Sequence, residues 1–269
     1  MLYLLEEDSY ILDKGTMSVN DGVTSIQEGE FSGDVNIISV VLPSSLSTID
    51  DNAFAYTPNL RSLVAYGNIQ YLGEAAFKGS SVETIAFKQD CRSINDEAFS
   101  ECPHLKSIAC RNLGDLSLGV KAFYKCKELK ELNLSNSIFE IKKACFYKCE
   151  SLRTIALPGA LQKISSFAFA GCKLLTYIEF PATLKTIEEN AFDSCISLTK
   201  IVFPDGLEYI GKKAFNRCTS LYDVTIPQNL KLLDIEAFTD CSALRRIAVS
   251  SKTEIINQDR LPSLEIQTI

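Results

Sequence analysis

Phenylalanine recurs along this chain of 269 residues at a nearly constant interval, and that interval limits what the chain can fold into. Ten of the 15 phenylalanines follow one another at steps of 23, 23, 22, 24, 23, 23, 23, 23 and 23 residues. A sequence period of about 20 to 50 residues is the signature of a repeat architecture. The ten positions are Phe31, Phe54, Phe77, Phe99, Phe123, Phe146, Phe169, Phe192, Phe215 and Phe238.

Other positions repeat with the phenylalanine frame. Counted forward from each phenylalanine, the third residue is cysteine in seven repeats, the sixth is usually leucine, and the ninth and eleventh are apolar. The twelfth is often proline, and the fifteenth and eighteenth are again apolar. The unit reads A-F-x-x-C-x-x-L-x-x-I-x-[LF]-P-x-x-L-x-x-I-x-x-x.

Each repeat is predicted to contain one short strand and one or two helical turns. Apolar residues at the ninth and eleventh positions alternate with period two, which is typical of a strand with one buried face. Proline directly afterwards removes a backbone donor and ends the strand. Acidic residues before the Ala-Phe pair, such as Glu188 and Glu189, favour helical turns in that segment.

A unit of 23 residues cannot bury its own apolar face, so neighbouring units must stack and share one core. The predicted fold is therefore an α/β solenoid of about ten repeats: a curved, right-handed coil that forms a single domain. Its parallel sheet is expected on the concave face, and the short helical turns on the convex face.

The repeat resembles the leucine-rich repeat of the BspA-like family, in which Leu-x-x-Ile-x-[LF]-Pro-x-x-Leu-x-x-Ile-x-x-x-Ala-Phe-x-x-Cys recurs at 23 residues. The stretches Leu175 to Cys195 and Leu198 to Cys218 match every position, and the resemblance extends roughly from Val23 to Ile256. It implies a leucine-rich repeat fold. It also implies a kinship with bacterial and protozoan surface proteins that are implicated in adhesion to host matrix proteins and to other cells.

Three segments are predicted. Residues 1–22 are expected to form an N-terminal cap, because Met17 and Val19 fall in the ninth- and eleventh-position phase of a partial repeat. Residues 23–250 form the solenoid, and residues 251–269 form a degenerate closing repeat or mark a point where the natural chain once continued. The 22- and 24-residue steps between Phe77 and Phe123 predict a local irregularity.

The cysteine column is interpreted as structural. Metal sites need ligands that converge, with cysteines two to four residues apart, whereas a 23-residue spacing places one thiol in each coil. The seven thiols are therefore expected to be buried and to act as small apolar groups. The one histidine, His104, is expected to be an exposed residue of a connector. No catalytic or nucleotide-binding motif is present, so we expect no enzyme activity, no metal site and no cofactor.

Charge and hydropathy bear on partners and compartment. A formal net charge of −7 and a pI near 5.0 argue against general binding to nucleic acid or to an anionic membrane. No apolar run of about 18 residues exists that could cross a bilayer, so no membrane insertion is expected. Met1 to Leu5 lead directly into three acidic residues without the pattern of a signal peptide. The localisation stays open, although the resemblance suggests the cell surface or secretion.

The outward-facing sheet positions are the candidate binding site. Because the ninth and eleventh residues point inward, the eighth and tenth must point outward. From the fifth repeat onward these positions carry charges around one aromatic side chain, which protein interfaces favour. An equally weighted alternative is that they form only a solvated strand surface. The candidate residues are Glu131, Asn133, Tyr177, Glu179, Lys200, Asp223 and Arg246.

The resulting hypothesis is a non-catalytic protein-binding module, most simply a cell-surface or adhesin-type protein that recognises a host or partner protein through its concave sheet face. The identity of that partner is not predicted. An alternative hypothesis is an intracellular scaffold or adaptor that uses the same face. A third is a spacer that holds another domain away from a surface.

Overall fold

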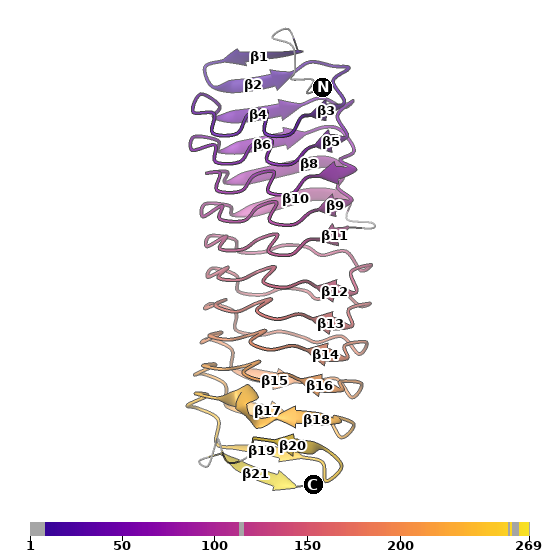
Figure 1. Cartoon of the computed structure of the whole chain (residues 1–269), viewed down its shortest axis with the longest axis vertical. Helices are drawn as coiled ribbons and strands as arrows, with labels where there is room; N and C mark the ends of the chain where they lie inside the picture. Colours follow the sequence, from indigo (N-terminus) through magenta and orange to yellow (C-terminus); the bar gives the residue numbers. More distant parts are fainter. Residues whose placement is uncertain (1–8, 113–115, 258, 260–263, 269) are drawn as a thin grey trace. The chain divides into compact units, whose positions relative to one another are not determined.

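The computed structural model describes residues 9–112, 116–257, 259 and 264–268 of the chain. Two compact units are present, Met1–Ser135 and Asn136–Ile269, each with its own sheets. In both units the backbone coils so that each repeat pairs with the same positions of the next repeat (Figure 1). The predicted parallel-sheet solenoid is thereby confirmed. The predicted curvature and the cap, solenoid and closing-repeat boundaries stay predictions.

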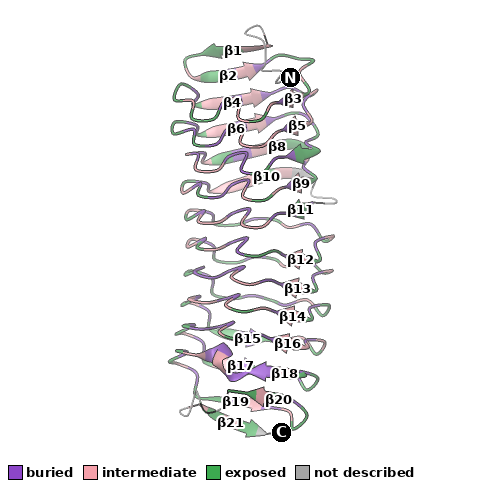
Figure 2. Cartoon of the chain, in the orientation of Figure 1, coloured by how far each residue is buried: buried purple, intermediate pink, exposed green. Residues whose placement is uncertain are grey.

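The first unit contains a six-stranded sheet in the order β1-β2-β4-β6-β8-β10. All neighbours are parallel except β1 and β2, which form an antiparallel hairpin. Residues alternate between buried and partly exposed along β4 and β6 (Figure 2), as the ninth and eleventh positions predict. The strands are β1 (Tyr10–Asp13), β2 (Thr16–Val19), β4 (Ser39–Leu42), β6 (Ser62–Ala65), β8 (Thr84–Asp90) and β10 (Ser107–Asn112).

A second, shorter strand occupies the seventeenth and eighteenth positions of the repeats, and the sequence pattern did not predict it. In the first unit it forms the sheet β3-β5-β7 and the pair β9-β11. Pairing is parallel and in register, for example Ile26 with Ile49 and Ile49 with Leu72. These strands are β3 (Ser25–Ile26), β5 (Thr48–Ile49), β7 (Tyr71–Leu72), β9 (Ser93–Ile94) and β11 (Ser117–Leu118).

The second unit repeats both kinds of strand. Its two sheets have the orders β15-β17-β19-β21 and β12-β13-β14-β16-β18-β20, and all printed pairs are parallel. The first set comprises β15 (Lys200–Val202), β17 (Asp223–Thr225), β19 (Arg246–Val249) and β21 (Glu265–Thr268). The second comprises β12 (Glu140–Ile141), β13 (Lys163–Ile164), β14 (Thr186–Ile187), β16 (Tyr209–Ile210), β18 (Leu232–Asp234) and β20 (Glu254–Ile256).

The core is built from files, which are columns of like side chains at the same position of successive repeats. All ten frame phenylalanines are buried. Within the second unit, the Phe169 ring stacks on Phe146 and on Phe192, with 5.2 Å between centroids in both pairs. The first unit contains the same stack from Phe31 to Phe123, with centroid distances of 5.3–5.5 Å. Each ring therefore gains its apolar contacts from the coils before and after it.

The cysteine file is buried, as predicted, and thiols along it also donate hydrogen bonds to backbone carbonyls. Cys195 Sγ donates a hydrogen bond to the carbonyl of Phe169 at 3.2 Å, across one coil boundary. Burial raises the pKa of the Cys102 thiol to about 12, so this group stays protonated and available as a donor. The equivalent bonds are Cys102 to Phe77, Cys126 to Phe99, Cys172 to Phe146, Cys218 to Phe192 and Cys241 to Phe215.

Except in the last repeat, where a 3-10 helix includes Ala237 and Phe238, the Ala-Phe segments are strings of tight turns, so the prediction of short helical turns in each repeat was wrong. In the described part of the chain the only helix with defined bounds is the 3-10 helix η2 (Ile235–Phe238). Successive backbone amides alternate between hydrogen bonds to the next coil and hydrogen bonds within their own coil. Phe54 N donates to Ala76 O of the next coil at 2.7 Å, whereas Ala55 N donates to Asn52 O of its own coil at 3.0 Å. A continuous helix would keep all these bonds inside one coil. This alternation of hydrogen bonds is accompanied by left-handed backbone at Asn52 and, four residues later, at Tyr56.

The N-terminal hairpin covers the edge of the first strand set. Lys14 and Gly15 both have positive φ, which suits the two-residue turn between β1 and β2. Met17 and Val19 are buried, as their phase predicts, and Tyr10 packs edge-on against the Phe31 ring at 5.5 Å. The apolar stretch Leu2 to Leu5, expected to belong to the cap, lies outside the described residues.

The irregularity predicted between Phe77 and Phe123 is confirmed. The register of β8 and β10 shifts between Cys110 and Asn112, and both strands are longer than β4 and β6. No helix among the described residues has the length and apolar character needed to span a bilayer.

Candidate functional site

The seven candidate residues are distributed over both units. Glu131 and Asn133 belong to the first unit and are exposed. The other five belong to the second unit, where Tyr177, Glu179, Lys200 and Arg246 are exposed and Asp223 is partly exposed. The outward direction assigned to these positions from the repeat pattern is therefore correct in both units.

Sheet register brings three of the candidates into one row. Lys200 on β15 pairs with Asp223 on β17, and Lys200 Nζ lies 3.0 Å from Asp223 Oδ2. Thr225 pairs with Ala248 on β19, which places Arg246 beside Asp223 in the same register. Arg246 in turn pairs with Glu265 on β21. The row thus alternates in charge across four strands.

The ion pair is exposed and contributes little stability. The hydrogen bond to Asp223, and then the charge of that carboxylate, raise the pKa of Lys200 above its ordinary range. Because both side chains are well exposed to solvent, such a pair contributes little to stability. The pair fixes a pattern of opposite charges on the exposed surface of the sheet.

Apolar and aromatic side chains surround this charged row. Tyr177, Val202 and Tyr222 are 53%, 56% and 62% exposed. The Thr199 amide donates to the Thr176 carbonyl at 3.4 Å, so the coil that carries Tyr177 lies next to the coil that carries Lys200. Tyr177 and Tyr222 both lie near Lys200. We call Tyr177, Glu179, Lys200, Val202, Tyr222, Asp223 and Arg246 the second-unit strand face.

Part of this face is hollowed. Tyr222, Asp223, Thr225, Arg246 and Gln267 line a shallow depression over β17, β19 and β21. The depression combines one phenol ring, two opposite charges and polar groups. Such a surface suits a protruding side chain of a partner better than it suits a substrate, because it does not enclose a ligand.

The described residues contain no group of three or more His, Cys, Asp or Glu that could hold a metal ion. His104 is exposed, as predicted, and its Nδ1 lies 3.0 Å from Glu128 Oε1. An exposed pair of this kind can act as a surface contact.

The comparisons with known proteins decide the family. The model of the "BspA type Leucine rich repeat region (6 copies)" matches residues 24–150 and 139–265, which together are most of the chain. The chain belongs to the BspA-type leucine-rich repeat family. Leucine-rich repeat solenoids are general scaffolds for protein interaction. No curated protein sequence matches this BspA-type chain.

Solved structures similar to this BspA-type chain include other bacterial repeat proteins. A leucine-rich repeat protein from Eubacterium ventriosum ATCC 27560 shares 20% identity over 91% of each chain, with a TM-score of 0.51. The T. pallidum leucine-rich repeat protein shares 22% identity over 79% of this chain and 86% of its own, with a TM-score of 0.52. At these identities the likeness shows the fold alone.

Two residues of the second-unit strand face, and Glu265 beside it, are not among the candidates predicted from sequence. The repeat pattern places Val202 at an outward tenth position, but the predicted candidates are only the charged, amide and aromatic side chains. Tyr222 lies at the seventh position, one residue before the positions that were counted. Glu265 follows Arg246 by 19 residues instead of 23, so counting along the repeat cannot find it. The exposed aromatic ring of Tyr222, beside a strand that begins at Asp223, is the one signal that could have been used.

Proposed function

We propose that the chain is a non-catalytic, adhesin-type binding module that recognises a host or partner protein through its second-unit strand face. The observation that carries the proposal is the exposure of Tyr177 and Tyr222 beside the Lys200–Asp223 ion pair. Tyrosine and arginine are enriched among the residues that dominate binding energy at protein interfaces. The location at a cell surface rests on the family resemblance.

The charge pattern favours a protein over a polyanion. Lys200 and Arg246 alternate with Asp223 and Glu265 along the row, so the four side chains carry no net charge. A phosphate backbone would be attracted by the two cations and repelled by the two carboxylates. A protein surface with its own alternating charges can complement the row, and this selects the partner more than it strengthens binding.

The proposal is tested by first capturing the partner at the face and then measuring its affinity. A photo-crosslinking phenylalanine analogue at Tyr222 is exposed to extracts of host cells and of the organism itself, and the crosslinked protein is identified and purified. We expect the Tyr177→Ala/Tyr222→Ala variant to bind that purified protein at least about 30-fold more weakly, since two hot-spot residues are worth about 2 kcal/mol or more.

The matched control is Tyr56→Ala/Tyr66→Ala. These tyrosines are 55% and 50% exposed but belong to the first unit, outside the face. The control should bind within about twofold of the unchanged protein. Equal affinities of both double variants, or an equal loss in both, would remove the second-unit strand face as the binding site. Circular dichroism of each variant verifies that the fold is retained.

A further inference from the structure

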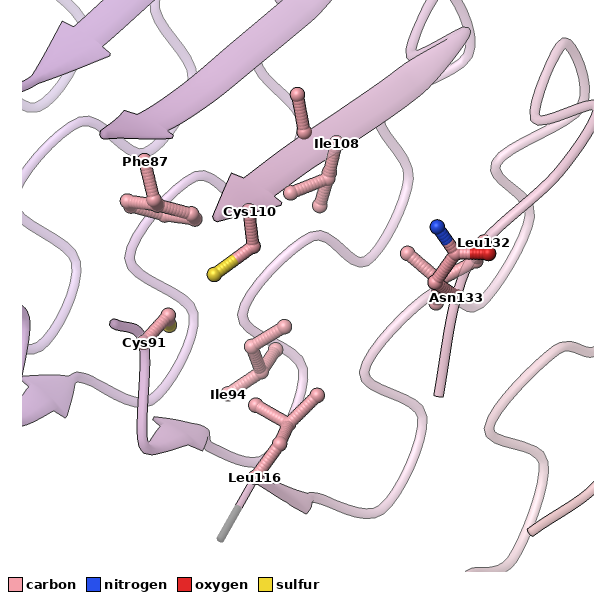
Figure 3. Close-up of a pocket in the computed structure, with 9 residues that line it drawn as sticks. Phe87, Cys91, Ile94, Ile108, Cys110, Leu116, Leu132 and Asn133 are labelled. Atoms are coloured by element: carbon pink, nitrogen blue, oxygen red, sulfur yellow. The ribbon is translucent and has the colours of Figure 1, made fainter. Parts of the chain in front are cut away.

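A cavity of about 180 Å³ opens in the first unit, at the irregular coils. It lies near the ends of β8 and β10, and its walls include Phe87, Ile94, Leu116 and Leu132. Figure 3 shows the Cys110 thiol projecting from the end of β10 into the space beside Phe87 and Cys91, with Asn133 on the opposite side. The cavity is separate from the second-unit strand face, which belongs to the other unit.

The cavity has an origin in the sequence. At the eleventh position, paired residues run Leu42, Ala65, Phe87 and then Cys110, so a thiol follows a full aromatic ring. Ile69 pairs with Cys91, where another thiol stands in place of an aliphatic side chain. Two adjacent coils therefore carry small side chains at neighbouring core positions, next to the register shift that follows Cys110.

The cavity is open to solvent. Val40, Leu63 and Ile85 occupy the ninth position of the preceding coils, and each is 1% exposed. Ile108 occupies the same position of the next coil and pairs with Ile85, yet it is partly exposed, as is Cys110. A ligand can therefore reach core side chains here without unfolding the coil.

Size and chemistry define what the cavity can hold. A cavity of about 150 Å³ lined by leucine, isoleucine and phenylalanine binds benzene, whereas drug-sized ligands need about 300 Å³ or more. Burial raises the pKa of the Cys91 thiol to about 12, so this wall is uncharged at neutral pH. Asn133 is exposed and supplies amide groups that can donate or accept a hydrogen bond.

We propose that this cavity is a binding site for a small, uncharged, single-ring aromatic molecule whose one hydrogen-bonding group faces Asn133. The ring lies against Phe87, Ile94 and Leu132 and occupies the volume that a large side chain at position 110 would fill. The bound molecule covers the Cys110 thiol. Multi-ring ligands are excluded by the volume.

The test uses phenol as the probe and the full chain as the protein. N-ethylmaleimide is expected to alkylate Cys110, which is partly exposed, and to leave the fully buried Cys195 unmodified. Saturating phenol should slow alkylation of Cys110 at least tenfold, as followed by mass spectrometry of the digested protein, and should raise the Tm. A rate and a Tm that phenol leaves unchanged would overturn the proposal.

A cavity-filling variant provides the specific control. Cys110→Phe introduces at position 110 the same side chain that Phe87 has in the preceding coil. Cys110→Leu introduces a smaller side chain, the one that Leu42 has at the same position of an earlier coil. Whichever variant folds should show no phenol-dependent rise in Tm. A rise equal to that of the unchanged protein would show that phenol binds elsewhere, and would overturn the assignment.

The polar contact is tested separately. Asn133→Leu should weaken phenol binding about tenfold and leave toluene binding unchanged, because toluene has no hydrogen-bonding group. Equal effects on both probes, or no effect on either, would contradict the role of the Asn133 amide.

Discussion

Phe169 is buried between the rings of Phe146 and Phe192, so its replacement tests the stacking of the core at a single residue. Phe169→Ala should lower the free energy of unfolding by about 3–5 kcal/mol, since a buried ring is lost and a cavity remains. Urea unfolding followed by circular dichroism measures the change. Phe139→Ala, at a ring that is 61% exposed and outside the frame, is the matched control and should change stability by less than about 0.5 kcal/mol.

A loss below about 1 kcal/mol for Phe169→Ala, or equal losses in the two variants, would contradict the stacked file. The same comparison shows what sequence reasoning can reach for a single side chain. The frame predicts that Phe169 and Cys172 are buried. It does not predict the bond from Cys172 Sγ to Phe146 O, because spacing carries no information on which carbonyl a thiol meets.

The backbones of two neighbouring coils come close together at Gly211, four residues before the frame phenylalanine Phe215. A Cβ at Gly211 would lie 2.7 Å from the Glu189 nitrogen and 2.9 Å from the Glu188 carbonyl carbon of the preceding coil. Gly211 N also donates to Ile187 O at 2.8 Å, which holds the two backbones together. The position therefore excludes a side chain unless the coils separate.

Gly211→Ala should destabilise the fold by about 1–3 kcal/mol, because the added carbon overlaps backbone atoms that cannot move alone. Gly159→Ala is the matched control: it lies in the same unit, and a Cβ there meets nothing within 4 Å. Chemical denaturation of the two variants gives the comparison. Equal stabilities would mean that the coils are not in close backbone contact at Gly211.

The strands and turns differ in how well sequence predicts them. Alternation at the ninth and eleventh positions identifies strands such as β4 and β6, because each has one buried face. The short strands have only two residues, too few to show alternation. Acidic residues before Ala-Phe fit a helical start and a string of turns equally well. Hydrogen bonds from backbone amides to the next coil, such as Phe54 N to Ala76 O, favour the string of turns. The sequence of a single repeat does not predict these hydrogen bonds.

For the whole chain, the repeat predicts the fold but only part of the candidate site. Counting positions finds Lys200, Asp223 and Arg246, because sheet register preserves the repeat. It misses Glu265, because the spacing changes there. It also does not predict the cavity beside Cys110, where Cys91 and Cys110 replace larger side chains in two adjacent coils. Function follows from such departures, whereas the fold follows from the regular positions.

The central claim is that each coil is held by its neighbours through files of like side chains, and excision of one coil tests it most directly. Deleting residues 175–197 removes 23 residues and joins Leu174 to Leu198 in frame. Deleting residues 175–185 removes only 11 and puts the coils on the two sides of the junction out of phase, which interrupts every file at that point. Urea unfolding, followed by circular dichroism, measures both.

The in-frame deletion should remain folded and unfold cooperatively, because each coil contacts only the coils next to it. The out-of-frame deletion should lose the fold of the second unit. Loss of structure in both proteins to the same extent, or retention in both, would contradict the account.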